Sequence, residues 1–115
     1  MHELYVTEQI VQIAVDTAKL EKMERIDKIT VVIGELTGII DDSVQFYFDI
    51  LVKDTTAKGA QLQIKRVTAT WICSSCELEY EQAVNGLNCP KCGRLGEYTG
   101  KGREFFVESI ECEER

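Results

Sequence analysis

The sequence predicts an α+β fold in which two helices pack on a small three-stranded mixed sheet, with a four-cysteine module inserted between the last two strands. Segments of helical and strand periodicity alternate as helix, strand, helix and strand, and a last strand follows the cysteines. The cysteines form two Cys-x-x-Cys pairs with twelve residues between them. These observations together define the predicted class.

Two segments have helical periodicity. The first helix is expected from Leu4 to about Lys22, where apolar residues recur at helical spacing and form a wide buried face. The second is expected from Asp42 to about Asp54. Asp42 followed by Gln45 resembles a capping box, which would define the start of this helix.

Three segments alternate like strands: 25–34, 61–71 with a bulge near Arg66, and 105–112. The first strand, second helix and second strand form a βαβ unit, which predicts parallel pairing with a right-handed crossover. We expect the last strand to pair antiparallel with the second strand. Gly100-Lys101-Gly102 is a plausible hinge before it.

The expected domain organisation is one α/β domain formed by 1–70 plus 101–115 and a module formed by 71–100. The chain of 115 residues is long enough for one modest core. The module has too few large apolar side chains for a core of its own. A piece this small usually needs a metal or disulfides to stay folded.

Composition limits the classes of partner. Net charge is −7 at pH 7, with 13 basic against 20 acidic residues, which argues against a nucleic-acid partner because such binding needs clustered Lys and Arg. No apolar run approaches the roughly 20 residues that span a bilayer, and the first residues do not resemble a signal peptide. We therefore expect a cytoplasmic location, where paired cysteines act as metal ligands rather than disulfides.

Cys73, Cys76, Cys89 and Cys92 can direct four thiolates at one tetrahedral ion. A closed four-thiolate site leaves no open position for catalysis, which favours structural Zn2+ in a zinc-ribbon-like module. Iron is an alternative, because the same geometry suits it. A dithiol oxidoreductase would need one Cys-x-x-Cys opening a helix after a strand, and two motifs at this spacing argue against it.

Other side chains offer weaker chemistry. Glu35 with Asp41 or Asp42 could form paired carboxylates, but turn and helix-cap roles explain them better. Cys112 is expected to be a small buried hydrophobe near the end of the last strand. We therefore expect no enzyme activity and no catalytic residue. The alternative function is a zinc-ribbon protein-interaction or nucleic-acid accessory module.

His2 is the only histidine in the chain. On general grounds a histidine beside an initiator methionine is a solvated end residue. The Met1 amine, the amide nitrogen of His2 and its imidazole can nevertheless form adjacent chelate rings. Nitrogen donors in a plane suit Ni(II) or Cu(II) and do not suit zinc. Glu3 adds a carboxylate that could bind the ion or orient the imidazole.

Four landmarks occur in one order over essentially the full chain. They are Met1-His2-Glu3, Gly34-Glu35-Leu36, the two cysteine pairs, and Glu108-Ser109-Ile110-Glu111. This combination resembles the HypA (HypA/HybF) family of nickel metallochaperones, which act in [NiFe]-hydrogenase maturation. The resemblance implies that His2 binds a transferable Ni2+ ion with Met1 and Glu3 nearby, and that the four cysteines hold Zn2+.

The resemblance also implies two partners: HypB, which is a nickel-binding GTPase, and the hydrogenase large subunit that receives the ion. The glycine-rich return 96–102 would permit a homodimer formed by domain swapping. Two residues depart from the family pattern. Cys112 stands where an aliphatic residue is expected, and Glu77 replaces the glycine often found after the first knuckle, where a turn favours positive φ.

Overall fold

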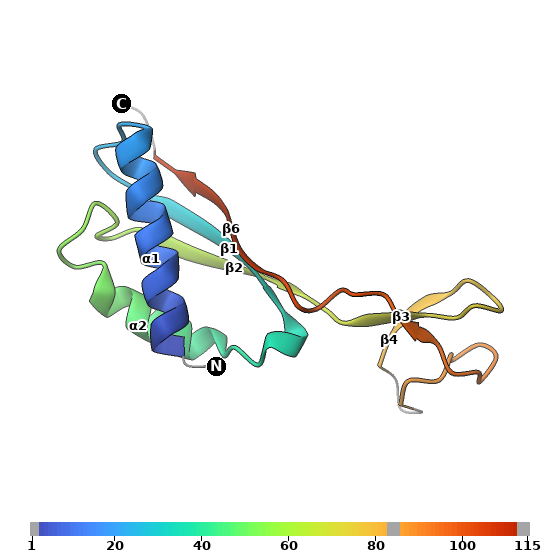
Figure 1. Ribbon diagram of the computed structural model, residues 1–115. Helices are drawn as coiled ribbons and strands as arrows, with labels where there is room; N and C mark the ends of the chain where they lie inside the picture. Colours follow the sequence, from blue (N-terminus) through green and yellow to red (C-terminus); the bar gives the residue numbers. More distant parts are fainter. Residues whose placement is uncertain (1–2, 83–85, 113–115) are drawn as a thin grey trace.

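The computed structural model describes residues 3–82 and 86–112. Two lobes, a helical lobe and a cysteine lobe, follow one another along the long axis (Figure 1), and the molecule measures 54 × 27 × 18 Å. Its radius of gyration is 18.1 Å, whereas a compact domain of this length would have about 13 Å. Within the described ranges, no helix is long and apolar enough to cross a membrane.

The helical lobe places two helices on one face of a three-stranded sheet (Figure 1). Strand order is β2-β1-β6, with β1 parallel to β2 and antiparallel to β6, so the predicted mixed sheet is confirmed. In chain order the elements are α1 (Glu3–Leu20), β1 (Lys28–Gly34), the 3-10 helix η1 (Glu35–Thr37), α2 (Asp41–Leu51), β2 (Gln61–Val67) and β6 (Phe105–Glu111).

The last strand, β6, pairs with β1 and not with β2 as the sequence predicted. Helix α1 contacts β6 and helix α2 contacts β2. Because the two helices lie side by side on the sheet, the strands beneath them lie on opposite sides of β1. This order puts β1 in the centre of the sheet, where six of its seven residues are buried. A nearly continuous apolar sequence is typical of a strand covered on both faces.

One apolar core fills the space between the helices and the sheet. Ile29, Val31 and Ile33 alternate along β1 and are fully buried. They belong to the same cluster as Ile10 of α1 and Phe48 of α2. Burial of each large apolar side chain contributes about 1.5–3 kcal/mol. This cluster is the main source of stability for the helical lobe.

The opposite face of β1 is shielded by an ion pair. Thr30 and Val32 are buried although both helices lie on the other side of the sheet (Figure 1). Lys65 of β2 is the register partner of Val32, and its Nζ lies 2.7 Å from Glu108 Oε2 of β6. Because β2 and β6 flank β1, this pair spans the central strand and covers it with its aliphatic stems.

Helix α2 begins without the capping box that the sequence predicted. Its N-cap is Ile40, which makes no side-chain cap hydrogen bond. Gln45 donates to Asp49 at 2.8 Å instead of reaching back to the helix start. Asp41 and Asp42 both lie in the first turn, where carboxylates interact favourably with the helix dipole.

The predicted bulge near Arg66 is also wrong. Strand β2 ends at Val67, and the chain enters a second sheet with β3 (Thr70–Ile72). The change of phase in the sequence marks this passage between sheets. β3 lies between β4 (Glu79–Glu81) and β5 (Glu97–Tyr98), with antiparallel pairing on both sides. The cysteine lobe is therefore inserted between β2 and β6, as predicted.

Three small buried residues form the joint between the lobes: Gly34, Ala69 and Gly102. A Cβ on Gly34 would lie 2.1 Å from the carbonyl carbon of Gly102, and a Cβ on Gly102 would lie 3.0 Å from Ala69 Cα. The Leu36 N–H also donates to the Gly102 carbonyl oxygen at 2.7 Å. Gly102 is therefore tightly packed, in contrast to the free hinge that the sequence suggested.

Candidate metal centre

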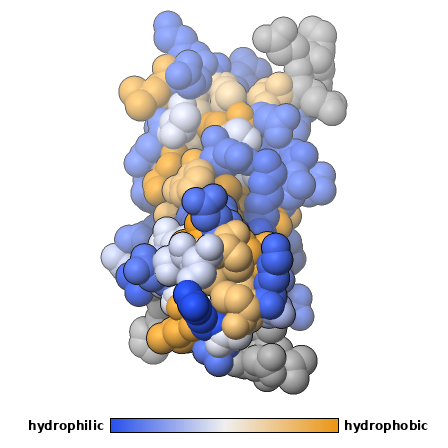
Figure 2. Space-filling view, turned by 90° about the vertical axis from the view of Figure 1, so that its right-hand side faces the viewer, coloured by the Kyte–Doolittle hydropathy of each residue, from blue (hydrophilic) through white to orange (hydrophobic). Residues whose placement is uncertain are grey.

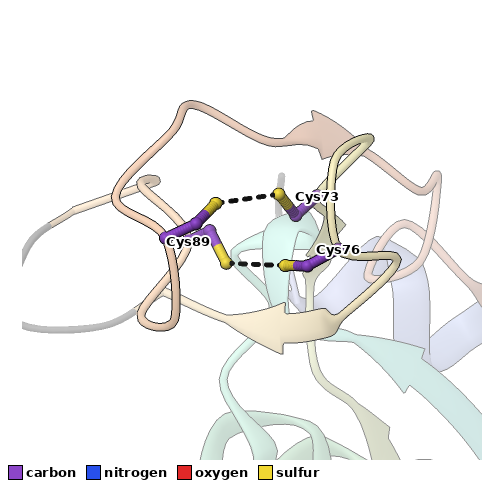
Figure 3. A group of neighbouring side chains, drawn as sticks. Cys73, Cys76 and Cys89 are labelled. Carbon is purple, nitrogen blue, oxygen red and sulfur yellow. Dashed lines mark hydrogen bonds between the residues drawn. The ribbon is translucent and has the colours of Figure 1, made fainter.

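The four paired cysteines converge in the cysteine lobe. Cys73 directly follows β3 and Cys76 lies in the turn before β4, while Cys89 and Cys92 lie in the return toward β5. The sulfur atoms of Cys73 and Cys92 are 3.3 Å apart, and those of Cys76 and Cys89 are 3.5 Å apart (Figure 3). All four sulfur atoms lie within 4.8 Å of one another.

The two knuckles share one backbone arrangement. In the first, the Cys73 N–H donates to the Leu78 carbonyl oxygen at 2.9 Å. In the second, the Cys89 N–H donates to the Arg94 carbonyl oxygen at 2.7 Å. In each loop, the hydrogen bond joins the first cysteine to the residue five positions later. The loop between them is a tight turn, which directs both sulfur atoms of the pair to the same side. The Cys-x-x-Cys spacing places both sulfur ligands of a pair within this closed loop.

A small aromatic core supports the knuckles. Tyr80 is buried with Cys73 and Cys89, and Trp71 packs against this cluster. The Tyr80 hydroxyl donates to the Leu87 carbonyl oxygen. With so few buried side chains, apolar packing alone is a weak source of stability for a piece of this size. The sulfur cluster must therefore supply part of it.

The sulfur atoms perturb one another electrostatically. The backbone N–H of Cys76 lowers the pKa of the Cys73 thiol to about 6. The hydrogen bond with the Cys73 sulfur raises the pKa of the Cys76 thiol to about 12. Two adjacent thiolates repel each other, so one sulfur keeps its proton when the other is ionised. A divalent cation would remove this repulsion and allow all four to ionise.

The donor set and its geometry are consistent with zinc. A tetrahedral ion with Zn–S bonds of about 2.3 Å would place its sulfur ligands roughly 3.8 Å apart, which falls between the observed 3.3 Å contact and the 4.8 Å limit of the group. Four sulfur ligands complete the coordination shell and leave no position for a substrate. Within 3–82 and 86–112, these four cysteines are the only cluster of three or more His, Cys, Asp or Glu side chains close enough together to hold one metal ion.

The predicted nickel residues belong to the other lobe. Met1 and His2 lie outside the described residues. Glu3 is the first residue of α1, and its Oε2 accepts the Ile40 N–H at 3.3 Å. Its carbonyl oxygen accepts the Thr7 hydroxyl at 2.6 Å. Glu3 is therefore attached to the start of α2 as well as to its own helix.

Glu35 and Asp41, two of the remaining candidate residues, have structural partners. Glu35 Oε1 accepts the Ala69 N–H at 2.9 Å, which fastens η1 to the joint. Asp41 Oδ1 lies 3.2 Å from Arg66 Nη1. Asp42 lies in the first turn of α2. Cys112 follows the last residue of β6 and is half-buried, less than the sequence suggested.

Sequence reasoning missed the role of Arg66. Its guanidinium donates to the Ile39 carbonyl oxygen at 3.2 Å and pairs with Asp41. It thereby attaches β2 to the segment that receives Glu3. The sequence offered one signal for this role, a charged residue near the end of an otherwise alternating strand. Its partners, Ile39 and Asp41, are more than twenty residues away along the chain, so the sequence pattern did not indicate them.

Comparison with known proteins identifies the family. The profile of the family described as "Hydrogenase/urease nickel incorporation, metallochaperone, hypA" matches residues 1–112. The chain belongs to the HypA family. A hydrogenase maturation factor HypA of Caldanaerobacter subterraneus subsp. tengcongensis is 47% identical, covering 98% of this chain and all of that protein. A HypA of Dehalococcoides mccartyi is 42% identical over 99% of this chain and 96% of its own length.

Solved HypA structures have the same fold. The solution structure of the Ni metallochaperone HypA from Helicobacter pylori has a TM-score of 0.63 and 22% identity, covering 96% of this chain and 97% of its own. A second HypA solution structure has a TM-score of 0.66 and 24% identity, covering 96% and 95%. The predicted α+β class is thereby confirmed. The HypA family description is that of a metallochaperone in hydrogenase maturation, not of a catalyst.

Proposed function

We propose that this chain binds Ni(II) at its amino terminus and delivers the ion to the [NiFe]-hydrogenase large subunit during maturation. Membership in a family of nickel metallochaperones supports a transferable nickel ion. The observation that carries the proposal is the convergence of four sulfur atoms, which would fill all four positions around a tetrahedral ion. A shell without an open position suits an ion that stays, so the cargo requires a second site.

The nickel ligand in this proposal is His2, the only histidine of the chain. The Met1 amine, the backbone amide nitrogen and the imidazole supply nitrogen donors that suit Ni(II). Glu3 contributes by position, since its hydrogen bond to Ile40 holds the start of α1 beside α2. A carboxylate oxygen engaged in this way is less available to a metal, which favours a supporting role for Glu3 over direct ligation.

Zn2+ in this proposal is a structural ion held by Cys73, Cys76, Cys89 and Cys92. Metal binding to such sites is coupled to folding and contributes on the order of 10 kcal/mol or more in small zinc peptides. A terminal nickel site can open without unfolding a domain, whereas the zinc site cannot. The two ions should therefore exchange at very different rates.

The partners in this proposal are HypB and the hydrogenase large subunit. The proposal also includes self-association of the chain, as a homodimer or a domain-swapped pair. A role in hydrogenase maturation supports partners from that machinery. A reducing compartment would keep the cysteines as ligands, which supports a cytoplasmic location. Each partner can be tested with purified proteins.

The decisive experiment changes only the amino terminus. Placing one extra residue before Met1, or acetylating its amine, should weaken nickel binding measured by calorimetry, because both changes remove the amine donor. His2→Ala should abolish tight nickel binding while zinc stays near one ion per chain. Unchanged nickel affinity in the extended protein would reject the amine chelate, and loss of zinc in His2→Ala would reject two separate sites.

A further inference from the structure

One peptide group joins the start of helix α1 to the end of strand β2. The Ile40 N–H donates to Glu3 Oε2 at 3.3 Å. The Ile39 carbonyl oxygen accepts a hydrogen bond from Arg66 Nη1 at 3.2 Å. This N–H and this carbonyl belong to the same peptide unit, and in a trans peptide they point in opposite directions. The peptide between Ile39 and Ile40 is therefore held from both sides, by Glu3 of α1 and by Arg66 of β2.

The chain on either side of this peptide is fixed as well. The Thr37 hydroxyl donates to the Gly34 carbonyl oxygen at 2.8 Å and accepts the Ile39 N–H at 3.2 Å. On the other side, Asp41 Oδ1 lies 3.2 Å from the same Arg66 nitrogen atom that binds the carbonyl. The Ile39 side chain is buried in the core of the helical lobe. The peptide thus has one orientation, and its N–H has a fixed direction.

Charge strengthens both hydrogen bonds of the peptide. A carboxylate lies at its N–H end and a guanidinium at its carbonyl end. Hydrogen bonds to ionised groups are roughly twice as strong as those between neutral groups. Bonds in a chain also polarise one another, because a donor at the carbonyl oxygen makes the N–H of the same peptide a better donor. Arg66 thereby strengthens the bond between Ile40 and Glu3.

Arg66 differs from a typical surface charge. Seen from the end of the cysteine lobe, hydrophilic side chains are scattered over the surface with apolar ones between them (Figure 2). An exposed ion pair on such a surface usually contributes little to stability. The Arg66 side chain is 38% exposed, and one of its two acceptors is the backbone carbonyl of a buried residue, Ile39. Removal of the guanidinium would therefore release one end of the peptide.

We propose that Arg66 is a positioning residue for the nickel site, a role that depends on the proposed binding of Ni(II) at the amino terminus. Glu3 directly follows His2 in the sequence, so the bond that orients Glu3 fixes the first turn of α1, which the nickel donors precede. A site supported in this way binds its metal more tightly, because less freedom is lost on binding. Arg66 acts through the peptide and not as a ligand, since a guanidinium has no acceptor atom.

The test compares Arg66→Ala with Arg25→Ala in the full, zinc-loaded chain. Arg25 is the matched control, because its side chain is also 38% exposed and pairs with an aspartate, Asp27, but it precedes β1 at the other end of that strand. Calorimetry should show nickel binding about tenfold weaker in Arg66→Ala, as expected for loss of a residue that supports a metal ligand. Binding should be unchanged in Arg25→Ala. Removal of a positive charge alone would strengthen binding of a dication, so the expected sign separates positioning from charge.

Amide spectra of the 15N-labelled chain without nickel test the path. The Ile40 amide proton should shift upfield in Arg66→Ala, as its bond to Glu3 weakens, and also in Glu3→Ala. Arg66→Ala should shift this signal less in the Glu3→Ala background than in the wild-type chain, because both changes act on one hydrogen bond. A general loss of stability would give additive shifts. Circular dichroism establishes that each variant is folded.

Three results would overturn the positioning role. They are wild-type nickel affinity in Arg66→Ala, an equal loss of affinity in Arg25→Ala, and an Ile40 amide signal that Arg66→Ala leaves unchanged. His2→Ala separates this role from the proposed function. If His2→Ala loses nickel while Arg66→Ala keeps full affinity, only the positioning role fails. If His2→Ala keeps tight nickel binding, the amino-terminal site is rejected and the positioning role is rejected with it.

Discussion

Glu77 and Gly93 occupy equivalent places in the two cysteine knuckles. The N–H of each donates at 2.8 Å to the carbonyl oxygen of the cysteine four positions earlier, Cys73 or Cys89. Both have a left-handed backbone, with φ of 58° at Glu77 and 78° at Gly93. Glycine adopts this conformation without steric cost, whereas a residue with a Cβ does not. The first knuckle is therefore the more strained of the two.

Replacing Glu77 with glycine should stabilise the zinc-bound lobe. Relief of the left-handed conformation is worth about 1 kcal/mol, part of which the greater chain entropy of glycine offsets. Zinc affinity, measured by competition with a chromogenic chelator, should rise. Gly93→Ala should lower it, since it introduces the same strain into the second knuckle.

Lys22→Gly provides the matched control for this effect. Lys22 also has a left-handed backbone, with φ of 55°, but it lies in the helical lobe. The substitution should leave zinc affinity unchanged. If Lys22→Gly and Glu77→Gly alter zinc binding equally, the effect does not come from the knuckle.

Gly34→Ala should disrupt the joint between the lobes. The new Cβ would lie 2.1 Å from the Gly102 carbonyl carbon, and this neighbour is backbone that cannot rotate away. We expect a loss of roughly 3 kcal/mol in the free energy of unfolding, at the upper end of overpacking effects. Urea unfolding followed by circular dichroism measures it.

Gly59→Ala is the control for the joint. Gly59 has a φ of 79°, but a Cβ there would meet nothing within 4 Å. Its cost should come from backbone strain alone, about 1 kcal/mol. A loss at Gly34 no greater than at Gly59 would mean that the joint adapts to the added methyl group.

Glu35→Ala should destabilise the same joint between the lobes. Ala69 is fully buried, and its N–H depends on Glu35 Oε1 at 2.9 Å. Removal of the acceptor leaves a buried donor unpaired, which costs about 1–3 kcal/mol. Hydrogen exchange at the Ala69 amide should accelerate in Glu35→Ala. Glu35→Gln keeps a side-chain oxygen and should stay close to wild type, and equal exchange in all three proteins would contradict the assigned bond.

Removing zinc should unfold the cysteine lobe and leave the helical lobe folded. Trp71 is the only tryptophan and packs against the cysteine cluster, so its fluorescence reports the state of the lobe. The helical lobe has its own apolar core. We expect a chelator to change the Trp71 emission while the helical circular dichroism persists. A loss of helix in parallel would show that the lobes fold as one unit.

Zinc affinity should fall as pH falls. In the metal-free site the pKa of Cys76 is raised to about 12, so this thiol is protonated near neutrality and releases its proton when zinc binds. Acid therefore favours the metal-free form. Below the Cys73 pKa of about 6 a further thiolate becomes protonated, so the slope should steepen there. Chelator competition between about pH 8 and pH 5 measures this dependence, and an affinity independent of pH would contradict it.

The sequence alone determined the elements and the metal donors. Helical and alternating periodicities identified both helices and the strands of the main sheet, because each pattern follows from which face an element buries. The Cys-x-x-Cys spacing identified Cys73, Cys76, Cys89 and Cys92, since ligands of a tight turn are close in sequence. The order of short motifs was sufficient to suggest the family.

Only the tertiary structure decided how these pieces meet. The pairing of β6 with β1 depends on how the two helices pack side by side on one sheet. Local sequence patterns do not encode this packing. The joint of Gly34, Ala69 and Gly102 joins residues far apart in sequence, where small size matters only in contact. Glu77 and Glu35 show the same limit: their positions in the sequence suggested turns, but their roles depend on the carbonyl and N–H groups that folding brings to them.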